Sequence, residues 1–135
     1  MEKVLKLSEL TGKTAFLNGQ PGLHEQEKKL EEKFREAGKE TLVLDNLFDS
    51  PKKLSKVKDC ENLVLSTTGM YREKLQPLME AFKKLNYAPK KVFFLSENTA
   101  MHFVGMARDL KEKHGTEFYY PDLLSKEFFW PIGWL

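Results

Sequence analysis

The 135-residue sequence contains one cysteine, three histidines and no long hydrophobic run. The lone cysteine, Cys60, cannot close an internal disulfide, and a zinc site with four cysteine ligands is excluded. No stretch approaches the ~20 consecutive apolar residues that a membrane-spanning helix needs. The sequence therefore predicts neither a disulfide framework nor a membrane segment, and we expect no metal site.

A dominant charge is missing as well. The chain has 22 Lys and Arg residues against 20 Asp and Glu residues, interspersed along the sequence. No basic stripe or basic arm is present, so the composition does not favour a nucleic-acid partner. Residues 1–10 show neither a hydrophobic signal core nor a leader rich in Arg and Ser. We expect a cytoplasmic protein.

The sequence does contain a regular succession of short apolar runs, most of them followed by a helical pattern. Its length and its hydrophobic content of 41% suffice for one core, and we expect a single domain over residues 1–124. The predicted strands are Thr14–Asn18, Thr41–Asp45, Asn62–Ser66, Val92–Leu95 and Phe118–Tyr120. The predicted helices cover residues 23–37, 50–57, 72–86 and 99–114.

Short, continuously apolar strands that alternate with helices are typical of a parallel sheet covered on both faces. The predicted fold is therefore α/β, a three-layer, Rossmann-like, doubly wound parallel sheet of about five strands. In the first helix, Leu23, Leu30, Phe34 and Ala37 share one face, and Gly38 stands where a left-handed cap belongs.

Residues 125–135 differ from the rest of the chain. Five large apolar side chains crowd into this segment: Phe128, Phe129, Trp130, Trp134 and Leu135. Pro131 and Gly133 are expected to interrupt any regular element. We expect an aromatic tail that packs on the domain or on a partner, because a contiguous exposed apolar patch of this size is unusual on a monomer.

Ligands of open parallel sheets bind at the carboxyl ends of the strands, so the loops that follow the strands are the candidate site. Six residues of these loops are candidates for cofactor binding: Gly19, Gly22, Asp45, Thr67, Thr68 and Gly69. The two glycines would let a phosphate approach the N-terminus of the first helix. Asp45 stands where an acidic residue meets a ribose hydroxyl in dinucleotide-binding folds.

Each of these residues also has a purely structural interpretation. Gly19 and Gly22 flank Pro21 in a tight turn that needs glycine for its geometry alone. Asp45 could be a solvated strand end, and the Ser/Thr run before Gly69 could cap a helix.

No catalytic residue is predicted. Cys60 has no histidine near it in the sequence, and His24 is the only histidine at the candidate edge. Glu97, next to Asn98, is the best acid or base by position, but it is a lone carboxylate. A nucleophile needs an adjacent base, and a metal needs three or four converging ligands.

The order of these features resembles the short-chain dehydrogenase/reductase family, in a truncated and degenerate form. Residues 11–19, Thr-Gly-Lys-Thr-Ala-Phe-Leu-Asn-Gly, resemble the entry strand of that family, and Asp45 matches its ribose-binding acid. Residues 62–69, Asn-Leu-Val-Leu-Ser-Thr-Thr-Gly, are similar to its Asp-x-Leu-Val-Asn-Asn-Ala-Gly strand. Residues 92–96 resemble the strand that bears its catalytic serine. The resemblance implies a Rossmann-type domain and an NAD(P) cofactor.

Two departures from the family pattern bear on activity. After Gly19 the family has three residues and then Gly-x-Gly, whereas this chain has a shortened loop over residues 20–24. The catalytic Tyr-x-x-x-Lys motif is missing, because no tyrosine lies between Tyr87 and Tyr119. Without these side chains nothing is placed to protonate a carbonyl oxygen.

We therefore expect a catalytically silent, dehydrogenase-like domain that acts through self-association or as a non-catalytic subunit of a partner enzyme. In the resembling family, the helices that correspond to residues 72–86 and 99–114 pair across a dimer. The alternative is a nucleotide- or dinucleotide-binding protein, taking NAD(P) or FMN, with a sensor or oxidoreductase role. A flavodoxin-like flavin site over residues 66–71 is one form of that alternative.

Overall fold

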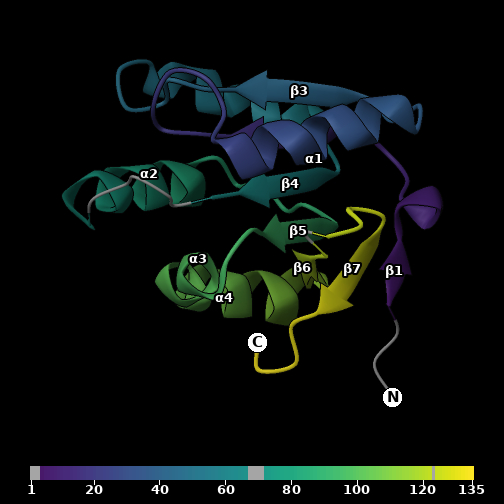
Figure 1. The fold of residues 1–135 in the computed structure, drawn as a ribbon. Helices are drawn as coiled ribbons and strands as arrows, with labels where there is room; N and C mark the ends of the chain where they lie inside the picture. Colours follow the sequence, from purple (N-terminus) through teal and green to yellow (C-terminus); the bar gives the residue numbers. More distant parts are fainter. Residues whose placement is uncertain (1–3, 67–71, 123) are drawn as a thin grey trace.

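A computed structural model describes residues 4–66, 72–122 and 124–135. The chain forms an α/β fold around one mixed sheet (Figure 1). The strands of the described residues are β1 (Leu5–Lys6), β2 (Thr14–Leu17), β3 (Thr41–Leu44), β4 (Asn62–Leu65), β5 (Lys91–Phe94), β6 (Glu117–Pro121) and β7 (Phe128–Pro131). The helices are η1 (Leu7–Glu9), α1 (Glu25–Glu36), η2 (Pro51–Asp59), α2 (Arg72–Lys84), α3 (Glu97–His102) and α4 (Val104–His114).

The sheet has seven strands in the order β1-β7-β6-β5-β4-β2-β3. Strands β2 to β6 are parallel, as predicted, but β7 runs antiparallel to both β6 and β1. The expectation of a purely parallel sheet of about five strands was therefore wrong at one edge. Residues 128–131 form β7, which pairs with β6 on one side and with β1 on the other. Pro131, which lacks an N–H, is the last residue of β7.

The order of the parallel strands differs from that of the dinucleotide-binding sheet. Strand β2 lies between β3 and β4, so the parallel strands are ordered 2-1-3-4-5 along the sheet, whereas the dinucleotide fold has 3-2-1-4-5-6. The direction of winding reverses between β2 and β4. This reversal defines a topological switch point of a doubly wound sheet, and the Rossmann layout that the sequence suggested is not confirmed.

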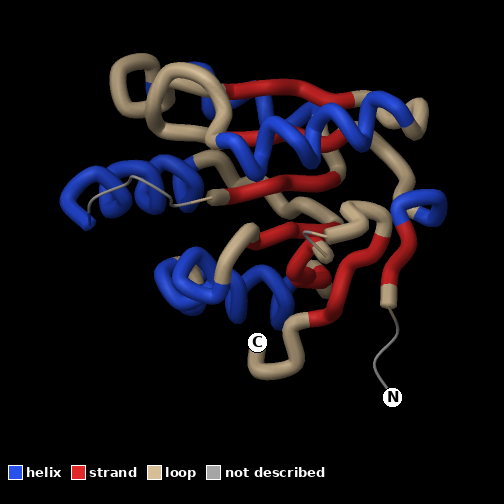
Figure 2. The backbone as a smooth tube through the Cα atoms, in the orientation of Figure 1, coloured by secondary structure: helices blue, strands red, loops and turns tan. Residues whose placement is uncertain are grey.

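Alternate residues of the strands contribute side chains to two cores on opposite faces of the sheet. Phe16, Val64 and Phe93 pack against α1 and against Leu7 and Leu10 of the N-terminal segment. On the other face, strand residues pack against side chains of η2, α2, α3 and α4. Figure 2 shows the helices placed on both sides of the strands. The parallel strands read as continuous apolar runs because both of their faces are covered.

Several predicted helices differ in detail from those observed. The helix expected over residues 99–114 is two helices, α3 and α4, which meet at Phe103. This side chain is fully buried and stacks on Phe94 at a centroid distance of 6.2 Å. The segment after Ser50 is a 3₁₀ helix, and Gly38 takes the predicted left-handed conformation with φ of 77°.

The resembling family pairs the helices that correspond to α2, α3 and α4 across a dimer, but the single apolar stripe on each helix favours packing on its own sheet, and most of these apolar residues belong to the core of their own chain. Leu75, Phe82, Ala100 and Ala107 are all buried against the sheet. No helix in the described part of the chain is long and apolar enough to cross a membrane.

Candidate functional site

The carboxyl ends of β2 and β3 bring together three of the predicted site residues, Gly19, Gly22 and Asp45. The backbone N–H of Gly22 donates to Asp45 Oδ2 at 2.5 Å. Asn18 closes the same loop, since its Nδ2 donates to the Gly22 carbonyl at 3.0 Å and its Oδ1 accepts from the Gln20 N–H at 3.2 Å. The loop after β2 is thus held by its own side chains and by β3.

Gly19 is buried beneath an aromatic ring. The Phe48 N–H donates to the Gly19 carbonyl at 3.0 Å, and a Cβ atom at position 19 would lie 2.3 Å from Phe48 Cζ. Gly22 is exposed and has φ of +77°, with open space where a Cβ would stand. Packing therefore requires glycine at position 19, and backbone conformation requires it at position 22.

Asp45 is held from two sides. The N–H of Gly22 lowers the pKa of this carboxyl, and Lys53, whose Nζ lies 3.7 Å from Oδ1, lowers it further. The same ammonium donates to the Asp45 carbonyl at 3.2 Å. An ionised Asp45 bound to Gly22 and Lys53 would have to exchange these partners to accept a ribose hydroxyl.

The remaining candidates are separate from this loop. Thr67, Thr68 and Gly69 lie outside the described residues. The Nδ1 atom of His24 accepts from the Gln26 N–H at 3.4 Å and caps α1. Glu97 lies in the first turn of α3.

Cys60 is buried, and its burial raises the pKa of the thiol. Within residues 4–66, 72–122 and 124–135, no group of three or more His, Cys, Asp or Glu side chains could hold a metal ion.

Glu27 is fully buried in the first turn of α1 and was not among the site residues predicted from the sequence. Neither carboxyl oxygen has a hydrogen-bond partner. Desolvation raises the pKa from its usual 4.5 to about 9, and the His24 backbone opposes this rise by a smaller amount. The signal was available: Glu27 lies four residues after Leu23 and three before Leu30, on the apolar face of the predicted helix.

The unpaired buried oxygens of the described residues share one region of the fold. Besides Glu27, they belong to Asn46, two residues after the end of β3, and Tyr120, near the end of β6. Polar groups at the opposite ends of the strands are paired: Asn62 Nδ2 donates to the Thr11 carbonyl at 2.8 Å. Unmade hydrogen bonds therefore gather toward the carboxyl edge, where a ligand of this fold would bind.

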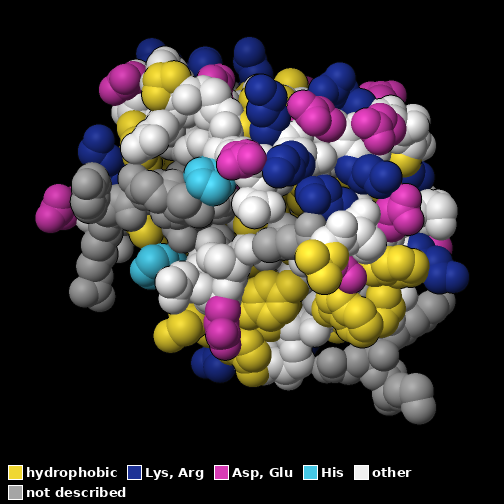
Figure 3. Space-filling model, in the orientation of Figure 1, with side chains coloured by type: hydrophobic (Ala, Val, Ile, Leu, Met, Phe, Trp, Pro, Cys, Tyr) yellow, Lys and Arg dark blue, Asp and Glu magenta, His cyan; other side chains and the backbone are white. Residues whose placement is uncertain are grey.

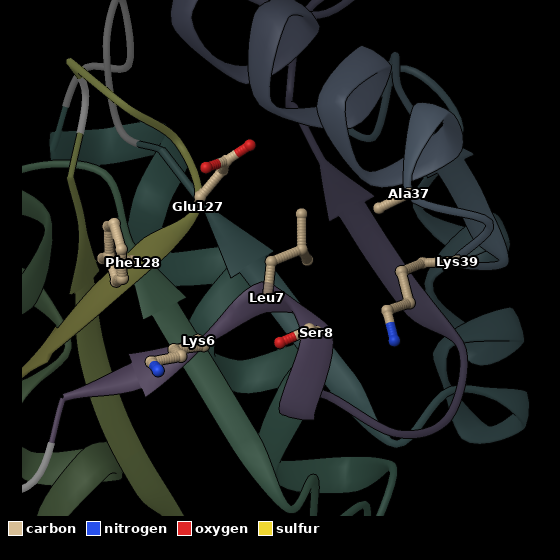
Figure 4. Close-up of a pocket in the computed structure, with 7 residues that line it drawn as sticks. All are labelled: Lys6, Leu7, Ser8, Ala37, Lys39, Glu127 and Phe128. Carbon is tan, nitrogen blue, oxygen red and sulfur yellow. The ribbon is translucent and has the colours of Figure 1, made fainter.

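One cavity lies away from this edge. It measures about 460 Å³ and is bordered by η1, the end of α1 and the start of β7 (Figure 4). Two of its charged residues already have partners, since Lys39 Nζ donates to the Leu10 carbonyl at 2.9 Å and Glu127 pairs with Lys33 at 3.3 Å. A smaller cavity of about 270 Å³ lies between η2 and α2, beside the loop that contains Phe48.

No protein-family model matches this chain. No curated protein matches it either.

The exposed aromatic residues of the C-terminal segment form a second candidate, an interaction surface. Phe128 and Trp130 alternate with the buried Phe129 along β7 and are 36% and 52% exposed, and Trp134 is 41% exposed. We call Phe128, Trp130 and Trp134 the aromatic surface. In Figure 3, hydrophobic side chains gather over the region of β6, β7 and β1, whereas charged side chains cover the region of α1.

Proposed function

We propose that this chain is a non-catalytic α/β domain that acts by self-association through the aromatic surface. The observation that carries this proposal is the exposure of Trp130 and Phe128 on the same side of β7. On the face of the sheet opposite α1, helices α3 and α4 lie beside β5 and β6 (Figure 1). Phe129 of β7 packs against α1 on the other face. Exposed aromatic side chains grouped in this way are enriched in protein interfaces.

The geometry favours association through the face of the sheet and not through its β1 edge. Edge strand β1 has only two residues, and the N–H of Lys6 already donates to Glu9 Oε1 at 3.1 Å. A short edge strand whose N–H is occupied is a poor template for another strand. A two-fold pair would instead place the aromatic surface of one copy on that of the other, which makes the contact self-complementary.

Two further features support a non-catalytic role. The predicted cofactor loop is closed by the Gly22–Asp45 hydrogen bond. Tyr119, the first tyrosine after the position where the resembling family has its catalytic tyrosine, is buried and donates to Glu117 Oε1 at 2.6 Å. Burial and this hydrogen bond raise the pKa of the Tyr119 phenol, so the group is poorly suited to donating a proton to a substrate.

Sedimentation velocity over a range of concentrations tests the proposal. We expect the mass to rise from 15.7 kDa toward twice that value as concentration increases. The variant Trp130→Glu should remain a monomer, and Met101→Glu, which changes a side chain 59% exposed on α3, should associate like the wild type. A wild-type monomer at every concentration would contradict self-association and leave the aromatic surface to a partner protein.

A second candidate function is the binding of a nucleotide-type ligand such as NAD(P) or FMN. The winding reversal between β2 and β4 favours it, together with the unpaired oxygens of Glu27 and Asn46. A thermal-shift titration with oxidised and reduced NAD(P), ATP and FMN tests it. A ligand at 100 times its dissociation constant adds roughly 2.7 kcal/mol of stability, and the absence of any shift with all of these compounds would reject this candidate.

A further inference from the structure

The cavity beside η2 and α2, which we call the slot, has two apolar walls. One wall contains Leu47 and Phe48, from the connection after β3, and Pro51, the first residue of η2. The other wall is α2, which contributes Pro77 and Ala81 along with Leu78. At about 270 Å³ the slot suits a single flat ring system better than an extended molecule.

Two contacts position the ring of Phe48. The buried Gly19 lies against one side of the ring, where no Cβ could stand. The Lys74 ammonium lies 5.0 Å from the ring centroid, a distance at which a cation and an aromatic ring attract each other. A preformed aromatic surface in an apolar slot favours stacking of a second ring, because little side-chain entropy remains to be lost.

The rim of the slot carries charges of both signs. Asp49 and Glu73 contribute carboxylates, and Lys74 contributes an ammonium. Pro77 has no N–H, so the carbonyl of Glu73 receives no helical hydrogen bond from position 77. This rim offers more acceptors than donors, which disfavours a bare anion and suits an uncharged group that carries N–H donors and at least one acceptor.

We propose that this slot binds a neutral, planar heteroaromatic ring of the nucleobase class, stacked on Phe48. The N–H groups of the ring face the carboxylates of Asp49 and Glu73, and a ring acceptor faces Lys74. The site is independent of self-association, because it is formed by η2 and α2 and not by β7. It also uses neither Gly22 nor Asp45, the residues expected from the sequence.

An NMR titration of the full chain with adenosine tests the proposal, with ribose 5-phosphate as the ring-free probe. We expect adenosine to shift the backbone amide signals of Phe48 and Ala81, and ribose 5-phosphate to leave them unchanged. The variant Ala81→Phe fills the slot and should weaken adenosine binding at least tenfold. Gln76→Phe adds the same ring to the exposed face of α2 outside the slot and should bind like the wild type.

A second variant keeps the test decisive if Ala81→Phe does not fold. Lys74→Met retains the apolar stem but removes the rim donor, and we expect adenosine binding to weaken at least threefold. The proposal is overturned if adenosine leaves both amide signals unchanged, if ribose 5-phosphate shifts them equally, or if binding survives in whichever variants fold. A mass that depends on concentration in the same samples would bear on self-association alone.

Discussion

Replacing Glu27 with glutamine should make the chain more stable at neutral pH. The wild-type carboxyl is fully buried in α1 without a hydrogen-bond partner, and desolvation raises its pKa to about 9. In the unfolded chain this group ionises near pH 4.5, whereas in the folded chain it stays protonated up to the raised pKa. The unfolded state therefore releases a proton that the native state keeps.

The magnitude follows from the difference in proton binding. Below pH 4.5 both states hold the proton and the group has no pH-dependent effect. Above that value each pH unit favours the unfolded state by about 1.4 kcal/mol, until the pH passes the folded pKa. At pH 7 the loss of stability from Glu27 therefore amounts to about 3 kcal/mol. Glutamine stays neutral throughout, so Glu27→Gln avoids this loss while retaining a similar shape.

Urea denaturation of the wild type and Glu27→Gln at several values between pH 5 and pH 8 measures the effect. We expect the two free energies of unfolding to lie close together at the acid end and to diverge as the pH rises. Glu32→Gln is the matched control, since Glu32 is exposed on the same helix, and it should parallel the wild type. A constant difference between wild type and Glu27→Gln across this range would refute the reasoning.

Two further substitutions test the loop after β2. Gly19→Ala should destabilise the fold by about 1–3 kcal/mol, because its Cβ would overlap the Phe48 ring; in a double-mutant cycle measured by urea denaturation, Phe48→Ala should relieve part of that cost, and strictly additive effects would contradict the packing role. Asp45→Asn should cost about 1 kcal/mol at neutral pH, because it replaces a carboxylate that accepts from Gly22. The pKa of Asp45 is lowered in the folded state, so its contribution is present above the unfolded pKa and is lost as pH falls through the folded one. An Asp45→Asn effect that persists undiminished in acid unfolding curves would count against this account.

The strands were predictable because burial leaves a direct trace in the sequence. Residues 14–17 and 62–65 are covered on both faces, so every side chain in them is buried. Such a strand can be recognised from its own apolar residues, without knowing which strands lie beside it. The order of the strands leaves no such trace. For example, β4 could join the sheet beside β2 or beside β3. Both placements bury the same residues and permit right-handed crossovers, so the sequence does not distinguish them.

The C-terminal segment shows how partial coverage hides a strand. Phe129 and Ile132 are buried in opposite cores, whereas Phe128 and Trp130 remain exposed. A strand pattern is normally recognised by alternation of apolar and polar residues. Here the exposed positions are aromatic, so the alternation is invisible and the segment resembles an irregular tail.

The candidate site illustrates a limit of glycine motifs as functional signals. A glycine that must admit a phosphate and one that must admit a phenyl ring are the same residue in the same local sequence. The side chain that occupies the space above Gly19 is Phe48, which lies in the connection after β3, far outside any local pattern. The Gly22–Asp45 hydrogen bond joins the same two segments. Phe48 also lines the slot beside α2. The contact between Gly19 and Phe48 therefore fills the space expected for a phosphate and at the same time positions the ring on which we propose that a heteroaromatic ligand stacks.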